Sequence, residues 1–235
     1  MIGSFNLIEK MIKFNVKNIV FSSTAAVYGN PIHSPICENH PTRPINPYGD
    51  SKLTIERLIY NYSKCHDLNF VILRYFNVSG SDFSNNLGEA HLPETHLIPL
   101  ALEAAYQNTI FKIYGDNYQT IDGTCVRDFI HVKDLGNAHL LSFKKLNSSK
   151  INEIINVGGG KGYTVYEIIK YVKKDKNLDL KIDVVKRRKG DPSILVSDIN
   201  KSKNILSWKP KYSDIEHMIS DSWEWYKYYK NLSQS

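Results

Sequence analysis

The feature that most constrains the fold of this chain is a strand, a helix and a second strand that follow one another early in the sequence. Residues 18–23 (NIVFSS) form a short apolar run, and residues 69–76 (NFVILRYF) are rich in β-branched and aromatic side chains, which favour strands. Between them, residues 48–66 carry apolar side chains at helical spacing. Because parallel strands need a crossover connection, usually a helix, this order predicts a parallel βαβ unit.

The rest of the chain continues the alternation of helices and strands. Further helices are predicted at residues 3–15, 97–107, 134–146, 164–174, 199–206 and 213–230, and further strands at residues 111–115, 153–160 and 180–186. Loops are expected at residues 31–47 and 81–94, where the periodic pattern is lost. The pattern predicts an α/β sheet with a smaller α/β lobe woven through the second half of the chain.

The composition is that of a soluble globular protein, with 42% apolar and 23% charged residues in a chain of 235. The net charge is +6, but the basic residues are scattered apart from one group at residues 186–189. No nucleic-acid-binding motif accompanies them, so we expect no nucleic-acid partner. No apolar run is long enough to cross a membrane, and the N-terminal segment lacks the features of a signal peptide.

The cysteines limit the kinds of cross-link that the chain can form. Cys37, Cys65 and Cys125 are odd in number and far apart, so they fit neither a disulfide framework nor a zinc site. We therefore expect no metal centre and a reducing, cytoplasmic location.

A glycine-rich stretch at residues 158–162 (GGGKG) invites comparison with a dinucleotide-binding loop. Its glycines do not have the G-x-G-x-x-G spacing, and no acidic residue closes a following strand at the required distance. The simpler interpretation is a tight turn between a strand and a helix. On this reading the sequence contains no phosphate-binding loop of the Rossmann type.

The stretch INPYGDSK, residues 45–52, places Tyr48 four residues before Lys52. In a helix that begins here, the two side chains would be neighbours, about 5–6 Å apart at their Cβ atoms. The ammonium and the helix dipole would both favour the phenolate and so lower the pKa of Tyr48. Such a tyrosine could take a proton from a sugar hydroxyl. Taken alone, the pair is better explained as two residues that meet by chance on a solvated helix face.

Hydroxyl side chains follow the strand that precedes this helix. Ser22, Ser23 and Thr24 lie at its carboxyl end, the edge at which open α/β sheets bind ligands. A hydroxyl held against a substrate oxygen would complete a set of Thr24, Tyr48 and Lys52 for proton transfer.

Five motifs in a fixed order give the chain a resemblance to a known family. SSTAAVYG, NPYGDSK, RYFNVSG, GTCVRDFIHVKDL and RRKGDP occur in this order in UDP-glucose 4-epimerases, which belong to the extended short-chain dehydrogenase/reductase group. The resemblance runs from residue 3 to about residue 225. It implies an NAD-dependent isomerase of nucleotide sugars, with UDP-glucose and UDP-galactose as substrates.

The resemblance also implies roles for individual residues. Tyr48 matches the family's catalytic base, Lys52 its partner at the nicotinamide ribose, and Thr24 the residue that holds the 4-hydroxyl of the sugar. The nicotinamide pocket would be lined by Ser22, Ser23 and Phe76. Contacts to the UDP-sugar would come from Asn77, His96, Leu97, Tyr114, Arg127, Arg188 and Asp191. Among these, Arg127, Arg188 and Asp191 match the family's clamp on the uridine diphosphate. An arginine fork suits phosphate oxygens, which agrees with this role.

The residues after Thr24 separate this reading from related reactions. Sugar-nucleotide dehydratases carry an acidic pair there, whereas this chain has Ala25 and Ala26. The resemblance therefore implies simple hydride removal from C4 to NAD and return to the opposite face. It leaves open whether N-acetylated hexoses are accepted, and it adds a homodimer as a further expectation.

The match begins partway through the family's fold. It implies a partial doubly wound, Rossmann-like parallel sheet that lacks its first half of roughly a hundred residues, together with a smaller α/β substrate-binding lobe. We expect residues 1–80 and 129–158 to form the NAD-binding part and residues 81–128 and 159–235 the UDP-sugar-binding lobe. Because the phosphate loop would be missing, a silent remnant that at most binds UDP-sugar or a partner chain is the alternative to an active epimerase.

Overall fold

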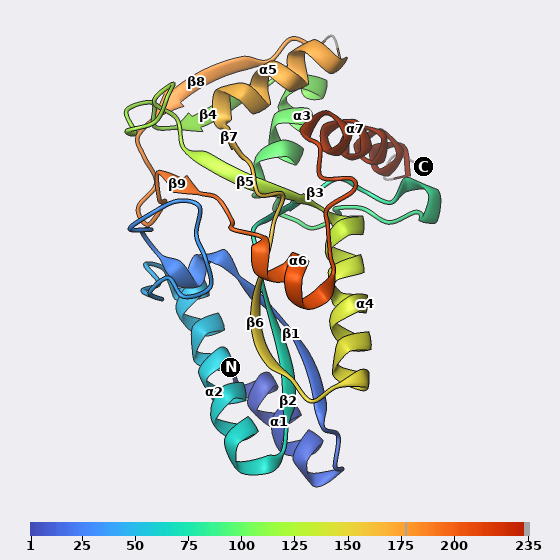
Figure 1. Cartoon of the computed structure of the whole chain (residues 1–235). Coiled ribbons are helices and arrows are strands. Elements are labelled where there is room, and N and C mark those ends of the chain that lie inside the picture. Colours follow the sequence, from blue (N-terminus) through green and yellow to red (C-terminus); the bar gives the residue numbers. More distant parts are fainter. Residues whose placement is uncertain (177, 233–235) are drawn as a thin grey trace.

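The computed structural model describes residues 1–176 and 178–232, and its lower half contains a parallel sheet (Figure 1). Three strands form this sheet in the order β1 (Asn18–Thr24), β2 (Asn69–Tyr75) and β6 (Asn152–Val157). Both strand pairs are parallel, with Ser22 beside Leu73 and Leu73 beside Ile155. The predicted βαβ unit is confirmed, and β1 pairs only with β2 among the described strands, so it forms an edge of this sheet.

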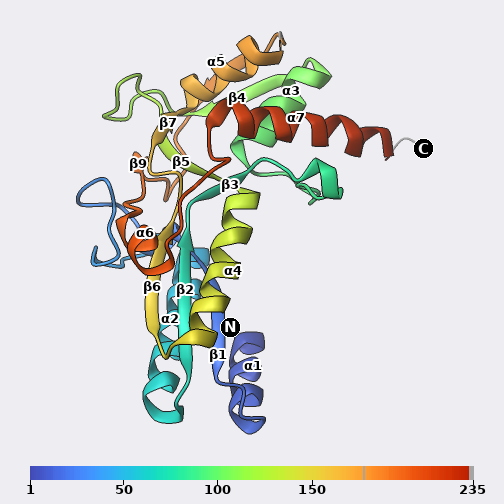
Figure 2. The ribbon, with the colours of Figure 1, turned by 45° about the vertical axis from the view of Figure 1, so that its right-hand side comes forward.

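Helices cover both faces of this sheet because the side chains of its strands alternate between the faces. On one face, Phe70 and Ile72 pack against α1 (Ile2–Lys13) and α2 (Pro47–His66). On the other face, Val71 and Leu73 pack against α4 (Val132–Ser148) and the short helix α6 (Asn200–Leu206). Figures 1 and 2 show α2 and α4 on opposite sides of the strands.

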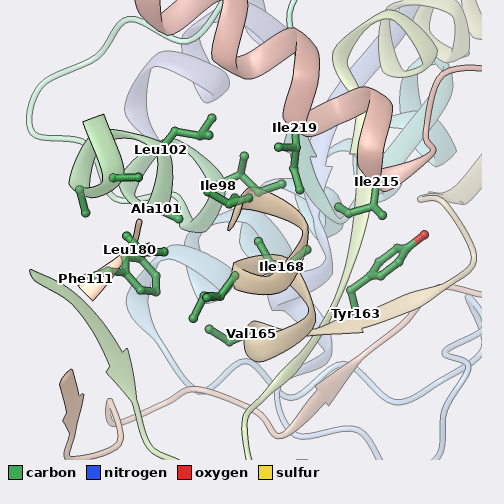
Figure 3. Packing of buried hydrophobic residues seen from close by; sticks show 14 of the residues in the cluster. Ile98, Ala101, Leu102, Phe111, Tyr163, Val165, Ile168, Leu180, Ile215 and Ile219 are labelled. Carbon is green, nitrogen blue, oxygen red and sulfur yellow. The ribbon is translucent and has the colours of Figure 1, made fainter. Parts of the chain in front are cut away.

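The upper half of the molecule is a second layered unit with its own core. Here β5 (Val126–His131) pairs with β3 (Asn77–Ser79), β7 (Gly162–Thr164) and β9 (Ile194–Leu195). A separate parallel pair joins β4 (Ile110–Tyr114) to β8 (Lys181–Val185). The helices α3 (Leu97–Gln107), α5 (Val165–Lys176) and α7 (Ile215–Leu232) enclose the core that Figure 3 shows, with Ile98, Ile168 and Ile219 among its buried side chains.

The predicted helices and the longer predicted strands are confirmed to within a few residues. The short strands β3, β7 and β9 and the six-residue strand β5 were missed. In β5 the charged residues Arg127 and Asp128 interrupt the apolar pattern, although both are buried and hydrogen-bonded. Two short 3-10 helices, η1 (Ala25–Tyr28) and η2 (Phe83–Asn85), lie in segments that carried no helical pattern. In the part of the chain that the structure describes, every helix is too short or too polar to span a membrane.

The glycine-rich stretch is a turn, as predicted, and it encloses a carboxylate of the chain itself. The N–H groups of Gly159 and Gly160 donate to Asp128 at 2.7 and 3.1 Å, and Ser197 donates to the same carboxylate from its N–H at 2.9 Å. A Cβ on Gly158 would lie 2.6 Å from that carboxylate. Burial raises the pKa of Asp128 to about 6, against the effect of these hydrogen bonds. The backbone N–H groups of Gly159 and Gly160 are therefore already used.

His131 joins β5 to two helices and is fully buried. Its Nδ1 accepts the N–H of Lys133 at 3.0 Å and caps α4, while Nε2 donates to Asp221 of α7 at 3.0 Å. The ring of His217 lies 5.6 Å away, and Asp134 is a further charge nearby. Burial lowers the pKa of His131, and Asp221 opposes this effect.

This environment predicts a loss of stability in mild acid. The folded state disfavours the imidazolium, so below the ordinary pKa of 6.5 the unfolded chain binds more protons at this position than the folded chain. The free energy of unfolding should therefore fall as the pH drops below about 6.5, and this fall should be smaller in His131→Gln. Urea denaturation at several pH values measures how the free energy of unfolding changes with pH in the unaltered chain and in His131→Gln. Equal slopes in the two proteins would contradict this role of His131.

Candidate active site

Two adjoining cavities lie between the lower and upper halves of the molecule. The first has a volume of about 220 Å³ and is lined by the end of β1, the start of η1 and the residues after β2. The second, of about 210 Å³, is enclosed by β3, α3, β4 and β5. Asn77, Arg127 and Asp191 line both cavities, so the two meet at these residues.

The first turn of α2 places Tyr48 beside Thr24, which lines the first cavity. Asn46 caps the helix by accepting the N–H of Gly49 at 2.8 Å, and Pro47 suits the first helical position because it needs no N–H partner there. Tyr48 is about half exposed and hydrogen-bonds to the side chain of Thr24. The structure thus brings together the tyrosine and the threonine that the sequence paired.

Lys52 lies on the same side of the helix, but its ammonium is directed to the sheet. Its Nζ is 5.8 Å from the centroid of the Tyr48 ring and donates to the carbonyl of Ser22 at 3.0 Å. Burial is the largest influence on Tyr48 and raises its pKa, Tyr75 adds to the rise, and the hydrogen bond with Thr24 opposes it. The expected lowering of the Tyr48 pKa by Lys52 is therefore wrong for this structure, because desolvation prevails and the ammonium is bonded elsewhere.

The hydroxyl residues at the end of β1 have different environments. Thr24 caps η1 by accepting the N–H of Ala26 at 3.1 Å and lines the first cavity. The hydroxyl of Ser22 lies 2.9 Å from Nε2 of His139. Ser23 is fully buried and donates to Glu56, so its side chain is turned away from the cavity. Phe76 is buried and lines the cavity wall.

A buried polar network lies directly behind these residues. Arg74 of β2 pairs with Glu56 of α2 at 2.5 Å, and both side chains are at least 96% buried. Arg74 also donates to the hydroxyl of Tyr28 at 3.2 Å, and Tyr28 donates to Asn156 of β6 at 2.6 Å. The network connects α2, η1, β2 and β6 at the end of the sheet where Thr24 and Tyr48 lie.

The second cavity gathers the residues that the sequence analysis grouped as a UDP clamp. Arg127 forms an ion pair with Asp191 and donates to the carbonyls of Val126 and Pro192, each at 2.7 Å. Asn77 donates to the carbonyl of Asp128 at 2.9 Å. These bonds hold the polar side chains at the junction of the two cavities.

Tyr114 and Arg188 lie at the far wall of this cavity. The guanidinium of Arg188 lies 3.7 Å from the centroid of the Tyr114 ring and lowers the pKa of this tyrosine through a hydrogen bond and its charge. His96 and Leu97 lie where α3 begins, and both line the cavity, although the imidazole of His96 contacts Glu94 at 3.0 Å. Most residues singled out from the sequence therefore line the two cavities, whereas Ser22, Ser23, Tyr48 and Lys52 are not part of either lining.

Sequence reasoning missed the residues that support the site. Glu56 stands one helical turn after Lys52, and a carboxylate within an otherwise apolar helix face is a signal that could have been noticed. Arg74 within the apolar run of β2 is a second such signal. Their pairing, and the contact of His139 with Ser22, come from the tertiary fold alone.

The parallel sheet with a helix carrying tyrosine and lysine at its ligand-binding edge defines a nucleotide-dependent enzyme of the doubly wound class. Residues 1–158 match the model of the NAD dependent epimerase/dehydratase family, and the chain belongs to this family. Within it, the chain is 44% identical to the UDP-glucose 4-epimerase of Halalkalibacterium halodurans over 96% of this chain and 68% of that protein. It is 43% identical, over the same shares, to the UDP-glucose 4-epimerase of Lacticaseibacillus casei.

Solved structures agree with these relatives. The UDP-glucose 4-epimerase of Brucella ovis in complex with NAD superimposes with a TM-score of 0.91 at 38% identity, over 95% of this chain and 69% of that one. The enzyme of Bifidobacterium longum in complex with NAD⁺ and UDP gives a TM-score of 0.91 at 36% identity, over 97% of this chain and 69% of that one.

The buried network leads to a prediction about stability. Arg74→Met leaves the Glu56 carboxylate buried without its partner, so we expect it to lower the free energy of unfolding by about 3–5 kcal/mol. The double variant Glu56→Met/Arg74→Met should lose less than the sum of the two single variants. Urea denaturation of the unaltered chain, the two single variants and the double variant gives this double-mutant cycle. The exposed pair Lys150–Asp67 serves as the control, since Lys150→Met should change stability little. Additive losses at Glu56 and Arg74 would contradict the coupling.

Proposed function

We propose that this chain acts as a UDP-glucose 4-epimerase, which interconverts UDP-galactose and UDP-glucose by inverting C4 of the hexose. The observation that carries the proposal is the juxtaposition of Tyr48, Thr24 and Lys52 at the edge of a parallel sheet, next to an arginine-lined cavity. The relatives named above support the reaction and the substrates.

The residues around the first cavity fit the redox end of NAD. Thr24 and Phe76 line the cavity. Lys52 lies on the adjoining helix α2, and the hydroxyl of Ser22 lies on the adjoining strand β1. We assign these residues, with Tyr48, to the nicotinamide and its ribose, and we give Ser23 a supporting role through Glu56. Gly159 and Gly160 are not assigned to the pyrophosphate, because their N–H groups donate to Asp128. NAD, when bound, supplies the acceptor for the C4 hydride and returns it.

In this proposal the protein moves one proton and holds one hydroxyl. Tyr48 takes the proton of the 4-hydroxyl and gives it back after inversion, while Thr24 hydrogen-bonds the same oxygen. The raised pKa keeps Tyr48 protonated until positive charge comes closer. Lys52 can provide this charge if its ammonium turns from the Ser22 carbonyl toward the phenol, since a nearby cation favours the phenolate.

The second cavity would bind the UDP part of the substrate. Arg127 and Arg188 offer guanidinium donors to the diphosphate, and a fork of donors matches phosphate oxygens. Asn77 would contact the diphosphate or the sugar, and Asp191 would accept from ribose hydroxyls. Tyr114 would pack on uracil after Arg188 leaves its ring face. His96 and Leu97 would line the UDP-sugar at the start of α3.

The division of labour between the two halves follows from these assignments. We propose residues 1–80 and 129–158 as the NAD-binding part and residues 81–128 and 159–235 as the UDP-sugar-binding lobe. Because Leu206 and Trp208 pack with β2 and β6, we propose that the short stretch around α6 returns to the NAD-binding part. The three free cysteines support a further proposal, that the enzyme works in the cytoplasm.

Tyr48→Phe tests the assignment of the proton-transfer group. The variant keeps the ring and loses the hydroxyl, so we expect the rate of UDP-galactose conversion to fall by about 10²–10⁴-fold. Tyr60→Phe, an exposed tyrosine on the same helix, should leave the rate unchanged. The assay is run on the full chain with added NAD. A rate unaffected by Tyr48→Phe would overturn the assignment, and UDP binding without any turnover by the unaltered chain would favour the silent remnant.

Arg127→Lys tests the UDP clamp. Lysine keeps the charge but loses the fork of donors, so we expect affinity for UDP to fall about tenfold or more. Isothermal titration with UDP measures this, and a thermal melt confirms that the variant is folded. Arg57→Lys, on the exposed side of α2, is the matched control. Equal UDP affinities in the two variants would exclude Arg127 from the binding site.

A further inference from the structure

The segment between η2 and α3 brings two histidines and two glutamates together outside the proposed catalytic groups. Glu89, His91, Glu94 and His96 each offer one ligand atom, and these atoms all lie within 4.8 Å of one another. The segment runs beside α7 in Figure 2. The cluster contains no cysteine, so the cysteine spacing that led to the expectation of no metal centre does not bear on it.

The contacts within the cluster converge on a single small volume. His91 contacts the carboxylate of Glu89 through Nδ1. Nδ1 of His96 lies 3.0 Å from Glu94 and 3.8 Å from Glu89. The two imidazole rings are 5.3 Å apart and nearly perpendicular, so neither blocks the other. Two nitrogen donors and two carboxylates thus face one another.

The backbone around the cluster is held by contacts with Trp225 and with the carboxylate of Glu94. The indole N–H of Trp225 donates to the carbonyl of Glu89 at 2.6 Å, and Gly88 lies so close to the indole that a Cβ there would be 2.2 Å from it. The carboxylate of Glu94 accepts the N–H groups of Thr95 and His96 at 2.6 and 2.7 Å, which fixes its orientation. Trp225 of α7 therefore holds the backbone at Glu89, and the N–H groups just before α3 orient the carboxylate of Glu94.

The charge of the cluster also favours a cation. In the ion pairs of this described segment, Glu89 and Glu94 contact only the imidazoles of His91 and His96. When these imidazoles are neutral, the two carboxylates lie close together without a positive charge between them. Like charges at this separation repel, and a divalent cation between them would remove the repulsion. Imidazole together with carboxylate is a donor set for zinc and its neighbours, whereas magnesium and calcium prefer oxygen alone.

We propose that Glu89, His91, Glu94 and His96 form a binding site for one divalent transition-metal cation of the zinc class. Because Thr95 and His96 line the second cavity, the cation would hold the segment that leads into the wall of that cavity. The site is distinct from the groups assigned to proton transfer, and its existence does not depend on the proposed epimerase activity.

Direct titration of the untagged full chain with Zn²⁺ tests this site. We expect one strong site by isothermal titration, and Co²⁺ should give the absorption bands of a low-symmetry nitrogen and oxygen site. Binding should change the fluorescence of Trp225, whose indole is bonded to Glu89. Mg²⁺ in place of Zn²⁺ should bind far more weakly, and acidification should weaken Zn²⁺ binding because metal ligands bind in their deprotonated forms.

The matched variants separate this site from other surface histidines. Glu89→Gln/His91→Gln removes two ligands from an exposed segment, and we expect Zn²⁺ affinity to fall about tenfold or more, with UDP binding retained as a check on folding. His66→Gln, an exposed histidine at the end of α2, should bind Zn²⁺ like the unaltered chain. Unchanged Zn²⁺ affinity in the double variant, or equal affinity for Mg²⁺ and Zn²⁺, would overturn the proposal.

Discussion

The carboxylate of Glu56 accepts from Ser23 of β1 and from Arg74 of β2 in the space between α2 and the sheet. The helix and the strand that carry this buried ion pair can move little relative to each other, because a buried charge without its partner strongly lowers the free energy of unfolding. Lys52 precedes Glu56 by one helical turn, and Thr24 follows Ser23 in the chain. The ion pair therefore sets the position of the helix and the strand end that carry the proposed proton-transfer groups. Tyr28 and Asn156 extend this restraint to η1 and β6.

The meeting of the two cavities has a simple origin in the path of the chain. Only Phe76 separates β2 of the lower sheet from β3 of the upper sheet. Asn77, the first residue of β3, therefore lines both cavities. β5 runs beside β3, and its buried Arg127 reaches the same place from the other strand. In the proposed function, a nicotinamide at the first cavity and a UDP-sugar at the second would therefore meet where these two adjacent strands adjoin.

The sequence predicted the βαβ unit and most helices from local periodicity, and it placed Thr24 near Tyr48 from the rule for parallel strand ends. The residues around the second cavity were implied only by the resemblance to the epimerase family. The sequence did not predict β5, since Arg127 and Asp128 look like surface residues until their buried partners are known. It also gave the wrong direction for the pKa of Tyr48. Spacing along a helix places Lys52 near the phenol, but only the fold reveals that Ser22 receives the ammonium and that burial prevails. Glu56 and Arg74 were missed for the same reason as β5.

The turn at residues 158–160 has a consequence for how variants of this chain would be interpreted. A side chain on Gly158 would meet Ser197 and Asp128, and one on Gly159 would meet the carbonyl of Phe129 at 2.6 Å. A mutational scan should therefore find these glycines as intolerant as residues in direct contact with substrate. The loss of stability in such variants would reflect the close packing of these glycines around the buried Asp128. It would not be evidence for a nucleotide-binding glycine motif.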